Sequence, residues 1–266
     1  MCELLALSTS HPTQLNFSLH TLAAHGGEGS STRDGWGVAF YQGRDVALFR
    51  EPSAAGNSAL VQFLETRGPP TTLAISHIRH ATRGSVSFAN TQPFMRELGG
   101  RTHVFAHNGD LPGIEQSGSL VPGAHRAIGQ TDSEHAFCAL LGRMTGLWSG
   151  AELPPLGARR AVVAAFAADL RALGPANFLY ADGDVLFAHG HRRKQSGRPR
   201  AEPPGLWMVQ QHCVGSEPAP DCGAGVSMSG GERLALLIAS VPLTDAAWRP
   251  LDEGELLVVR DGQVLG

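Results

Sequence analysis

Short apolar segments joined by tight-turn sequences limit the fold of this chain more than any other feature. The turns 42–45 (Gln-Gly-Arg-Asp) and 181–184 (Ala-Asp-Gly-Asp) each join two such segments and predict β-hairpins. Hairpins between groups of helices favour an α+β fold, with antiparallel sheets covered by helices and not repeated βαβ units. Apolar spacing predicts those helices over 12–25, near 60–64, from Thr131 or Asp132 to about 147, and over 156–173.

The rest of the chain fits the same fold class. Residues 190–232 are rich in glycine and proline, contain five basic residues and lack periodicity, so long surface loops are predicted there. No linker or internal repeat divides the sequence, which indicates a single domain over residues 1–266. The other predicted strands are Glu3–Ser8, 72–78, 103–107, 206–209, 234–240 and 255–264.

Composition excludes several classes of function. The formal charge of −3 provides no general attraction to nucleic acid or to an anionic membrane. The chain has one lysine and twenty arginines, and Lys194 follows Arg193, so the Gly-Lys-Ser/Thr sequence of a phosphate-binding loop is absent. Lys194 lies in a very polar stretch, which disfavours a pyridoxal enzyme.

Cellular location is predicted from three observations. No apolar run approaches the roughly 18 residues that span a bilayer. The start of the chain lacks a basic segment, and Glu3 stands where a signal peptide would be apolar. Four cysteines without a C-x-x-C pair suit a reducing compartment. A cytoplasmic protein that does not bind membranes is therefore expected.

Cys2 occupies the position with the greatest chemical consequence. A small residue after Met1 permits removal of the methionine, which leaves the Cys2 thiol beside a free α-amine with an ordinary pKa of ~7.7–8.0. That amine can take the thiol proton and later return it to a leaving group, so one residue supplies both nucleophile and base. The alternative interpretation is a small buried cysteine that starts a strand.

Further short segments follow Cys2 in a characteristic order. With these segments the chain resembles the class II, N-terminal nucleophile glutamine amidotransferases, and within them the stand-alone bacterial YafJ-like group. The resemblance implies a four-layer αββα sandwich, one type-2 glutamine amidotransferase domain and no cofactor. The segments are Met1–Leu5, Arg33–Gly37, Ser76–Thr82, Asn90–Phe94, Ala106–Asp110, Gln130–Glu134, Asn177–Gly183 and Ala239–Thr244.

The resemblance also implies roles for individual residues. Arg79 corresponds to the arginine that holds the substrate carboxylate, for which a planar guanidinium is suited. Asp132 corresponds to the acidic residue that pairs with the substrate ammonium, and Asn108 and Gly109 to the oxyanion hole. Taken singly, these residues also fit a surface ion pair, a helix cap and an ordinary turn, respectively.

Other candidates are less specific. Thr82 and His107 are expected to help bind the substrate, while Trp36, His80 and Phe94 are candidates to line or brace the pocket. The histidine pairs 77/80 and 103/107 lie in predicted strands, where they are poorly placed to share an ion, so no metal site is predicted. The basic run from His189 to Lys194, with Arg198 and Arg200, is expected to be a solvated loop; an anion or partner-docking site is the alternative.

The predicted function is that of a glutamine amidotransferase-like amide hydrolase with a small-molecule substrate. Cys2 would attack the carboxamide of glutamine or of a γ-glutamyl amide, form a thioester and release ammonia or an amine. Either a separate synthase subunit accepts the ammonia or the enzyme simply hydrolyses its substrate, and homo-oligomers are compatible with both. The main alternative is a non-catalytic glutamine-sensing or regulatory protein that retains the pocket. An amidase for apolar acyl groups is disfavoured because Arg79 and Asp132 would stay unpaired.

Overall fold

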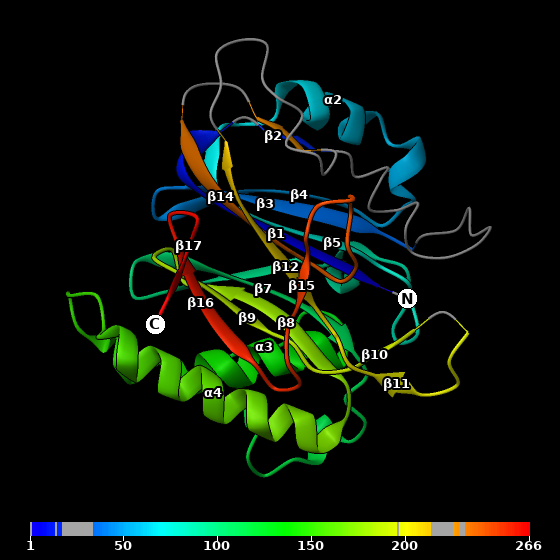
Figure 1. The fold of residues 1–266 in the computed structure, drawn as a ribbon. Coiled ribbons are helices and arrows are strands. Elements are labelled where there is room, and N and C mark those ends of the chain that lie inside the picture. Colours follow the sequence, from blue (N-terminus) through cyan, green and yellow to red (C-terminus); the bar gives the residue numbers. More distant parts are fainter. Residues whose placement is uncertain (1, 14, 18–33, 196, 214–225, 229–231) are drawn as a thin grey trace.

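Two antiparallel β-sheets lie face to face, with helices on their outer sides (Figure 1). The fold is that of a computed structural model, which describes residues 2–13, 15–17, 34–195, 197–213, 226–228 and 232–266. Helix α2 (Ala59–Arg67) covers the seven-stranded sheet, and helices α3 (Asp132–Met144) and α4 (Leu156–Leu173) cover the six-stranded sheet. The layer order is αββα, which confirms the predicted sandwich.

The seven-stranded sheet has the strand order β15-β12-β14-β1-β5-β3-β4. Strand β1 pairs antiparallel with β14 on one side and β5 on the other, so the residues that follow Cys2 run through the interior of the sheet. The strands are β1 (Glu3–Thr13), β3 (Trp36–Gln42), β4 (Asp45–Glu51), β5 (Thr71–Ile78), β12 (Trp207–Cys213), β14 (Arg233–Ala239) and β15 (Arg249–Pro250).

The six-stranded sheet has the order β17-β16-β9-β8-β7-β6. Its strands are β6 (Phe94–Leu98), β7 (Arg101–Gly109), β8 (Ala176–Ala181), β9 (Leu186–His189), β16 (Leu256–Arg260) and β17 (Gln263–Leu265). Two short pairs complete the described strands: β10 (Arg193–Lys194) with β11 (Ala201–Glu202), and β2 (Leu15–Phe17) with β13 (Val226–Met228). Short 3-10 turns lie at Ala55–Asn57, Phe88–Asn90, Ile114–Gln116 and Leu147–Ser149.

Alternation along β1 explains why the two sheets stack. Leu4 and Ala6 belong to the apolar cluster between the sheets, whereas Leu5 and Leu7 belong to the cluster under α2. Successive side chains of a strand point to opposite faces, so a run that is apolar at every position is buried on both sides. β1 is therefore shielded by a second sheet on one face and by a helix on the other.

Most of the predicted elements are confirmed. Both hairpins form, and Gly183 takes the positive φ (79°) that the tight turn between β8 and β9 needs. Thr131 is the N-cap of α3, since its side chain accepts a hydrogen bond from the Glu134 backbone N–H. None of the helices in the described ranges is long and apolar enough to cross a membrane.

Two predictions about local structure are wrong. The helix expected over 12–25 is not formed where the structure describes it, because Pro12 and Thr13 end β1 and residues 15–17 form β2; residues 14 and 18–25 lie outside the described residues. Residues 190–232 are not only surface loops, since β12 is a strand of the seven-stranded sheet and β10 and β11 form a short hairpin. Chain positions 214–225 and 229–231 lie outside the described residues.

Candidate active site

The Cys2 thiol lies against the backbone that follows β5. Its Sγ accepts a hydrogen bond from the His80 N–H (3.3 Å) and donates to the His80 carbonyl oxygen (3.4 Å). Within the described part of the chain, no imidazole or carboxylate contacts this sulfur. The sulfur is therefore positioned by peptide groups and has no side-chain base among those residues.

Burial raises the pKa of the Cys2 thiol above its ordinary value of 9.0, while the hydrogen bond with the His80 backbone acts in the opposite direction. The thiol is therefore mainly protonated at neutral pH and needs a base to become a nucleophile. Burial also lowers the pKa of His77 to about 3, helped by the His107 and Arg79 charges, so this imidazole is a poor base.

A short network around Asp34 fixes the backbone that holds the thiol. The Asp34 N–H donates to the Arg79 carbonyl oxygen (3.0 Å), and the Arg79 N–H donates to the Gly35 carbonyl oxygen (2.7 Å). Two residues after Arg79, the Ala81 N–H donates to the Asp34 carboxylate (2.7 Å). These bonds bracket His80, whose peptide groups contact the sulfur.

Asn108 approaches Cys2 from the other sheet. It lies near the end of β7, and its Nδ2 donates to the Cys2 carbonyl oxygen (2.6 Å). The backbone just before it is held by Gln92, whose amide donates to the His107 carbonyl oxygen (3.2 Å) and accepts from the His107 N–H (2.6 Å). Strand β7, held by Gln92, thus places the side-chain amide of Asn108 at the backbone of Cys2.

Asn177 also supports this arrangement, a role that the sequence did not predict. It is the register partner of Asn108 on β8, and its Nδ2 donates to the carbonyl oxygens of Asn108 (3.0 Å) and Arg192 (2.7 Å). Its Oδ1 accepts from the His191 N–H (2.8 Å). One buried amide therefore joins the strand of Asn108 to the basic run.

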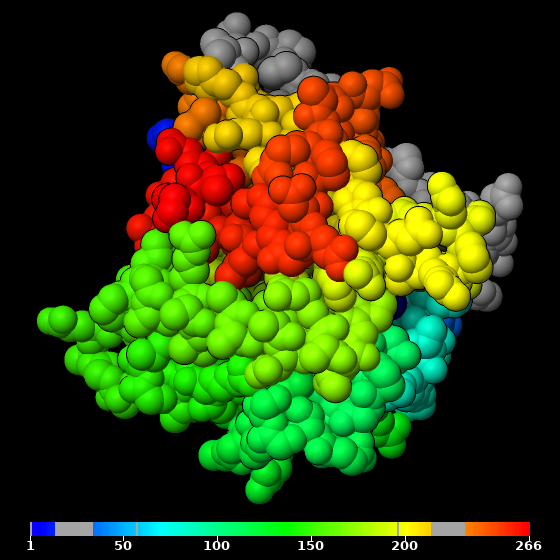
Figure 2. Space-filling model, turned by 60° about the horizontal axis from the view of Figure 1, so that its bottom comes forward, coloured from blue at the N-terminus to red at the C-terminus, as the bar shows by residue number. Residues whose placement is uncertain are grey.

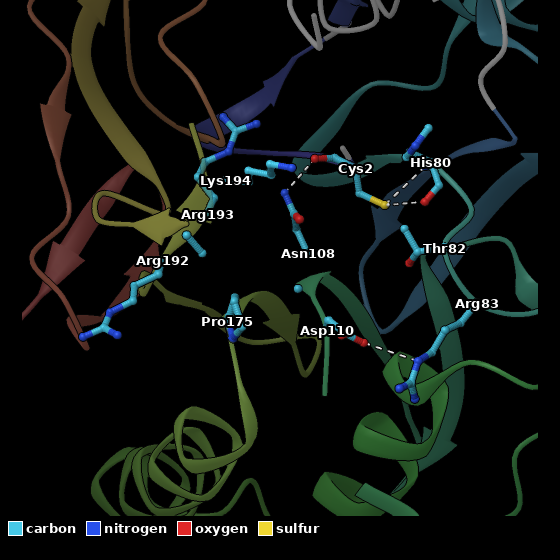
Figure 3. A pocket seen from close by; sticks show the side chains of 12 residues that line it. Cys2, His80, Thr82, Arg83, Asn108, Asp110, Pro175, Arg192, Arg193 and Lys194 are labelled. Carbon is cyan, nitrogen blue, oxygen red and sulfur yellow. Dashed lines mark hydrogen bonds and ion pairs between the residues drawn. The ribbon is translucent and has the colours of Figure 1, made fainter. Parts of the chain in front are cut away.

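A cavity of about 290 Å³ opens beside the thiol (Figure 3). It lies at the end of the sheets where the N-terminus and the β10–β11 hairpin meet (Figure 1). Figure 2 shows this hairpin as the yellow projection beside the cyan-green segments. The lining residues are Cys2, His80, Thr82, Arg83, Asn108, Gly109, Asp110, Pro175, Arg192, Arg193, Lys194 and Ala201.

Arg79 is buried beside the cavity but does not line it. Its Nη1 donates to the Ser85 carbonyl oxygen (3.2 Å), and its Nη2 donates to the carbonyl oxygens of Arg83 (2.8 Å) and Gly84 (3.3 Å). Burial lowers its pKa, and the nearby Cys2 and Asp34 groups oppose that shift. Arg79 is therefore not a surface ion pair; it holds the loop that follows Thr82.

Asp132 is likewise buried and does not line the cavity. Its Oδ2 accepts from the Leu111 N–H (2.9 Å), and its Oδ1 accepts from the Ser133 N–H (2.8 Å) and hydroxyl (3.3 Å). The carboxylate therefore lies in the first turn of α3 and anchors Leu111, the residue after Asp110, which does line the cavity.

The remaining candidates separate into two groups. Thr82 and His80 line the cavity, and the His80 backbone contacts the thiol. His107, Trp36 and Phe94 do not line it. The His107 ring is buried against the Ser133 hydroxyl, 2.9 Å from its Nδ1. Trp36 and Phe94 face the outer clusters of the two sheets, because strand alternation directs them away from the space between the sheets.

The basic run is not the solvated loop that was expected. Arg193 is buried, its Nη2 is 2.8 Å from the Glu3 carboxylate, and its Nη1 donates to the Ser240 carbonyl oxygen (2.6 Å). Lys194 and Arg192 line the cavity on either side of it. Glu3, an acidic residue directly after Cys2, was the only signal in the sequence for its pairing with Arg193. The two partners are 190 positions apart in the chain.

Two of the histidines that raised a metal interpretation, His103 and His107, have hydrogen-bond partners for their rings. The His103 ring nitrogens lie 2.7 Å from the Tyr180 hydroxyl and 3.1 Å from the Leu98 carbonyl oxygen. No cluster of three His, Cys, Asp or Glu side chains able to hold a metal ion occurs in the ranges that the structure describes.

Two stacked antiparallel sheets with helices on their outer sides form the sandwich fold of the N-terminal nucleophile type, and Cys2 directly precedes an interior strand of it. The sequence profile of the class II glutamine amidotransferases matches residues 1–266. YafJ of Escherichia coli (strain K12) is 38% identical over 189 residues, which cover 71% of this chain and 72% of YafJ. The chain therefore belongs to the class II glutamine amidotransferases.

Solved structures agree with this assignment. The crystal structure of a predicted glutamine amidotransferase from Pseudomonas aeruginosa PA01 matches with a TM-score of 0.69 and 30% identity, covering 100% of both chains. The glutamine phosphoribosylpyrophosphate amidotransferase of B. subtilis matches with a TM-score of 0.59 over 99% of this chain and 48% of its own. At 17% identity, that second match shows a shared fold.

Proposed function

We propose that this chain hydrolyses the carboxamide of glutamine or of a γ-glutamyl amide, with Cys2 as the nucleophile. The observation that carries the proposal is the meeting of the Cys2 thiol, the Asn108 amide and Gly109 at one cavity. In the proposed reaction Met1 has been removed, so the Cys2 α-amine is free. This amine takes the thiol proton, because no side-chain base contacts the sulfur in the described residues.

The first half of the reaction forms a thioester. Sulfur attacks the carboxamide carbon, and negative charge develops on its oxygen, where the second N–H of Asn108 Nδ2 and the Gly109 backbone N–H would stabilise it. The ammonium of Cys2 then gives its proton to the departing nitrogen, the C–N bond breaks, and ammonia or an amine leaves. In the second half, water loses a proton to the amine and attacks the thioester; the C–S bond breaks, glutamate leaves and the thiol regains its proton.

Recognition of the glutamyl group is assigned to Arg79 and Asp132. A guanidinium has five N–H donors, and the three hydrogen bonds to residues 83–85 leave two of them for a carboxylate. The Asp132 carboxylate accepts its bonds mainly from backbone N–H groups and keeps lone pairs for an ammonium. Neither group lines the cavity as it stands, so the loop held by Arg79 would have to shift when substrate binds.

Incubation of the processed protein with L-glutamine and with γ-glutamyl amides tests the proposal. Glutamate release is expected from the wild type and not from Cys2→Ala, and intact mass should show loss of one methionine. A protein that keeps Met1 and binds glutamine without releasing glutamate would support the regulatory alternative and contradict catalysis.

The pH dependence of kcat/KM should follow the protonation state of the Cys2 α-amine. Only the neutral amine accepts a proton, so kcat/KM should rise with pH through the ordinary α-amine range of ~7.7–8.0 and then level off. Attack by a preformed thiolate predicts a different profile, because burial raises the thiol pKa above 9.0 and the rise would then occur above that pH. Initial rates with glutamine from pH 6 to 10 separate the two mechanisms, and a rise confined to the upper range would exclude the amine as base.

Gly109 is expected to tolerate no side chain. A Cβ at this position would overlap the Pro175 carbonyl oxygen, so Gly109→Ala must displace the end of β7 or the start of β8. Misplacing one oxyanion donor typically lowers kcat about 10²- to 10³-fold. Gly118→Ala is the matched control, since nothing lies within 4 Å of its added Cβ. Equal kcat values for the two variants would exclude Gly109 as a donor to the oxyanion.

The fate of the ammonia is part of the same proposal. We expect either a separate synthase subunit or simple hydrolysis, and pull-down with mass spectrometry distinguishes them. A free nucleophilic thiol favours the reducing cytoplasm as the site of action.

A further inference from the structure

Lys194, the only lysine of the chain, differs from the other cations that line the cavity. Arg83 lies 3.3 Å from Asp110, Arg192 lies 2.7 Å from Glu253, and Arg193 lies 2.8 Å from Glu3. The Lys194 ammonium has no acidic partner within 4 Å among the residues that the structure describes. Three of these cations are thus neutralised within the protein, and Lys194 is available to a ligand.

The position of Lys194 is fixed although its side chain is exposed. Its neighbour Arg193 is buried against Glu3, the residue that follows Cys2. Lys194 is also the register partner of Ala201 in the β10–β11 hairpin. These contacts fix the backbone of Lys194, which lines the same cavity as Cys2.

Lys194 also lies on a definite side of the cavity. Figure 3 shows Thr82 and Arg83 on one side of Cys2 and Asn108, Asp110 below them, and Lys194 on the side opposite Thr82. The first side is built by the loop that Arg79 holds and by the chain that Asp132 anchors. The proposed function holds the glutamyl group on that first side, so the departing nitrogen and its substituent would extend toward Lys194 and Ala201. Arg192 extends away from the cavity in the same view.

From this placement we infer that the substrate is a γ-glutamyl amide whose amine portion carries an anionic group, a carboxylate being the simplest, and that Lys194 binds this group. The inference rests on the proposed function and narrows it, since free glutamine has no such group. Lys194 is a specificity-determining residue and takes no part in the chemical steps.

Matched donors test the inference. γ-Glutamyl-alanine and γ-glutamyl-alaninamide have nearly the same size and differ by one negative charge. Wild type should prefer the alanine donor in kcat/KM by about five- to tenfold, the scale of an exposed charge-assisted contact. Lys194→Met should reduce that ratio to about one, and Lys194→Arg should keep part of it. Arg198→Gln, which removes a cation outside the cavity lining, should leave the ratio unchanged.

Several outcomes would overturn the inference. A ratio of one in wild type, with glutamine hydrolysed normally, rejects the inference and leaves the proposed function intact. An equal loss of activity on both donors in Lys194→Met would mean that Lys194 acts on the glutamyl group or only on the fold. If no donor is hydrolysed at all, the proposed function fails. The inference about the substrate then fails as well, because it rests on that function.

Discussion

Insertion of one glutamate between Met1 and Cys2 should lower kcat for glutamine about 10²- to 10⁴-fold, the usual contribution of a general acid–base group. A large residue after Met1 prevents its removal, and the Cys2 nitrogen then becomes part of a peptide bond that cannot accept a proton. The thiol itself is retained, but burial keeps its pKa above 9.0 and no side chain in the described residues replaces the base. Glutamate release by the purified variant, with intact mass verified, measures the effect.

A steric explanation needs a separate control. The insertion could block the cavity or disturb β1, so the rate of Cys2 alkylation by iodoacetamide and the thermal unfolding midpoint should both be compared with wild type. Loss of turnover with near-normal alkylation and stability assigns the effect to the amine. Wild-type turnover in a protein shown to retain the extension would exclude the amine as the base.

The sequence predicted elements whose determinants are local. Helices α3 and α4 follow from apolar residues three and four apart, and the β8–β9 turn follows from Asp-Gly at 182–183. The helix predicted over 12–25 was wrong because the pairing partner that decides the structure there is remote in sequence. Leu15–Phe17 pair with Val226–Met228, about 210 positions along the chain. Helical spacing of leucines carries no information about such a partner.

The candidate active site shows the same difference between features that the local sequence predicts and features that depend on remote residues. Cys2, Asn108, Gly109 and Thr82 were identified from sequence, and the structure brings them to one cavity. The prediction for the basic run was wrong because a run of charges usually marks a solvated face of a protein. The Glu3 carboxylate that pairs with the buried Arg193 is far away in sequence. The role of Asn177 was missed for a related reason, because it depends on three hydrogen bonds to residues that are distant in sequence.

Glu3→Gln should destabilise the protein by about 3–5 kcal/mol, the typical cost of leaving one member of a buried ion pair uncompensated. Glu3 is fully buried and Arg193 nearly so, with 2.8 Å between the carboxylate and Nη2. Glutamine preserves the shape of the side chain and removes its charge, so the Arg193 guanidinium stays buried without a counter-charge. Urea unfolding followed by fluorescence measures the change in the free energy of unfolding.

Glu253→Gln is the matched control, because it removes the charge that pairs with the adjacent Arg192 at the surface, where the two side chains are 49% and 39% exposed. Glu253 Oε1 also lies 3.4 Å from the His191 Nε2, and the glutamine oxygen can still accept a hydrogen bond there. An exposed pair contributes about 0–1 kcal/mol, so this variant should unfold close to wild type. The double variant Glu3→Leu with Arg193→Met should recover much of the stability lost in Glu3→Gln, because it removes both buried charges together. Similar unfolding free energies for Glu3→Gln and Glu253→Gln would show that the buried Glu3–Arg193 pair does not anchor the basic run. The fixed backbone position of Lys194 would then need another cause.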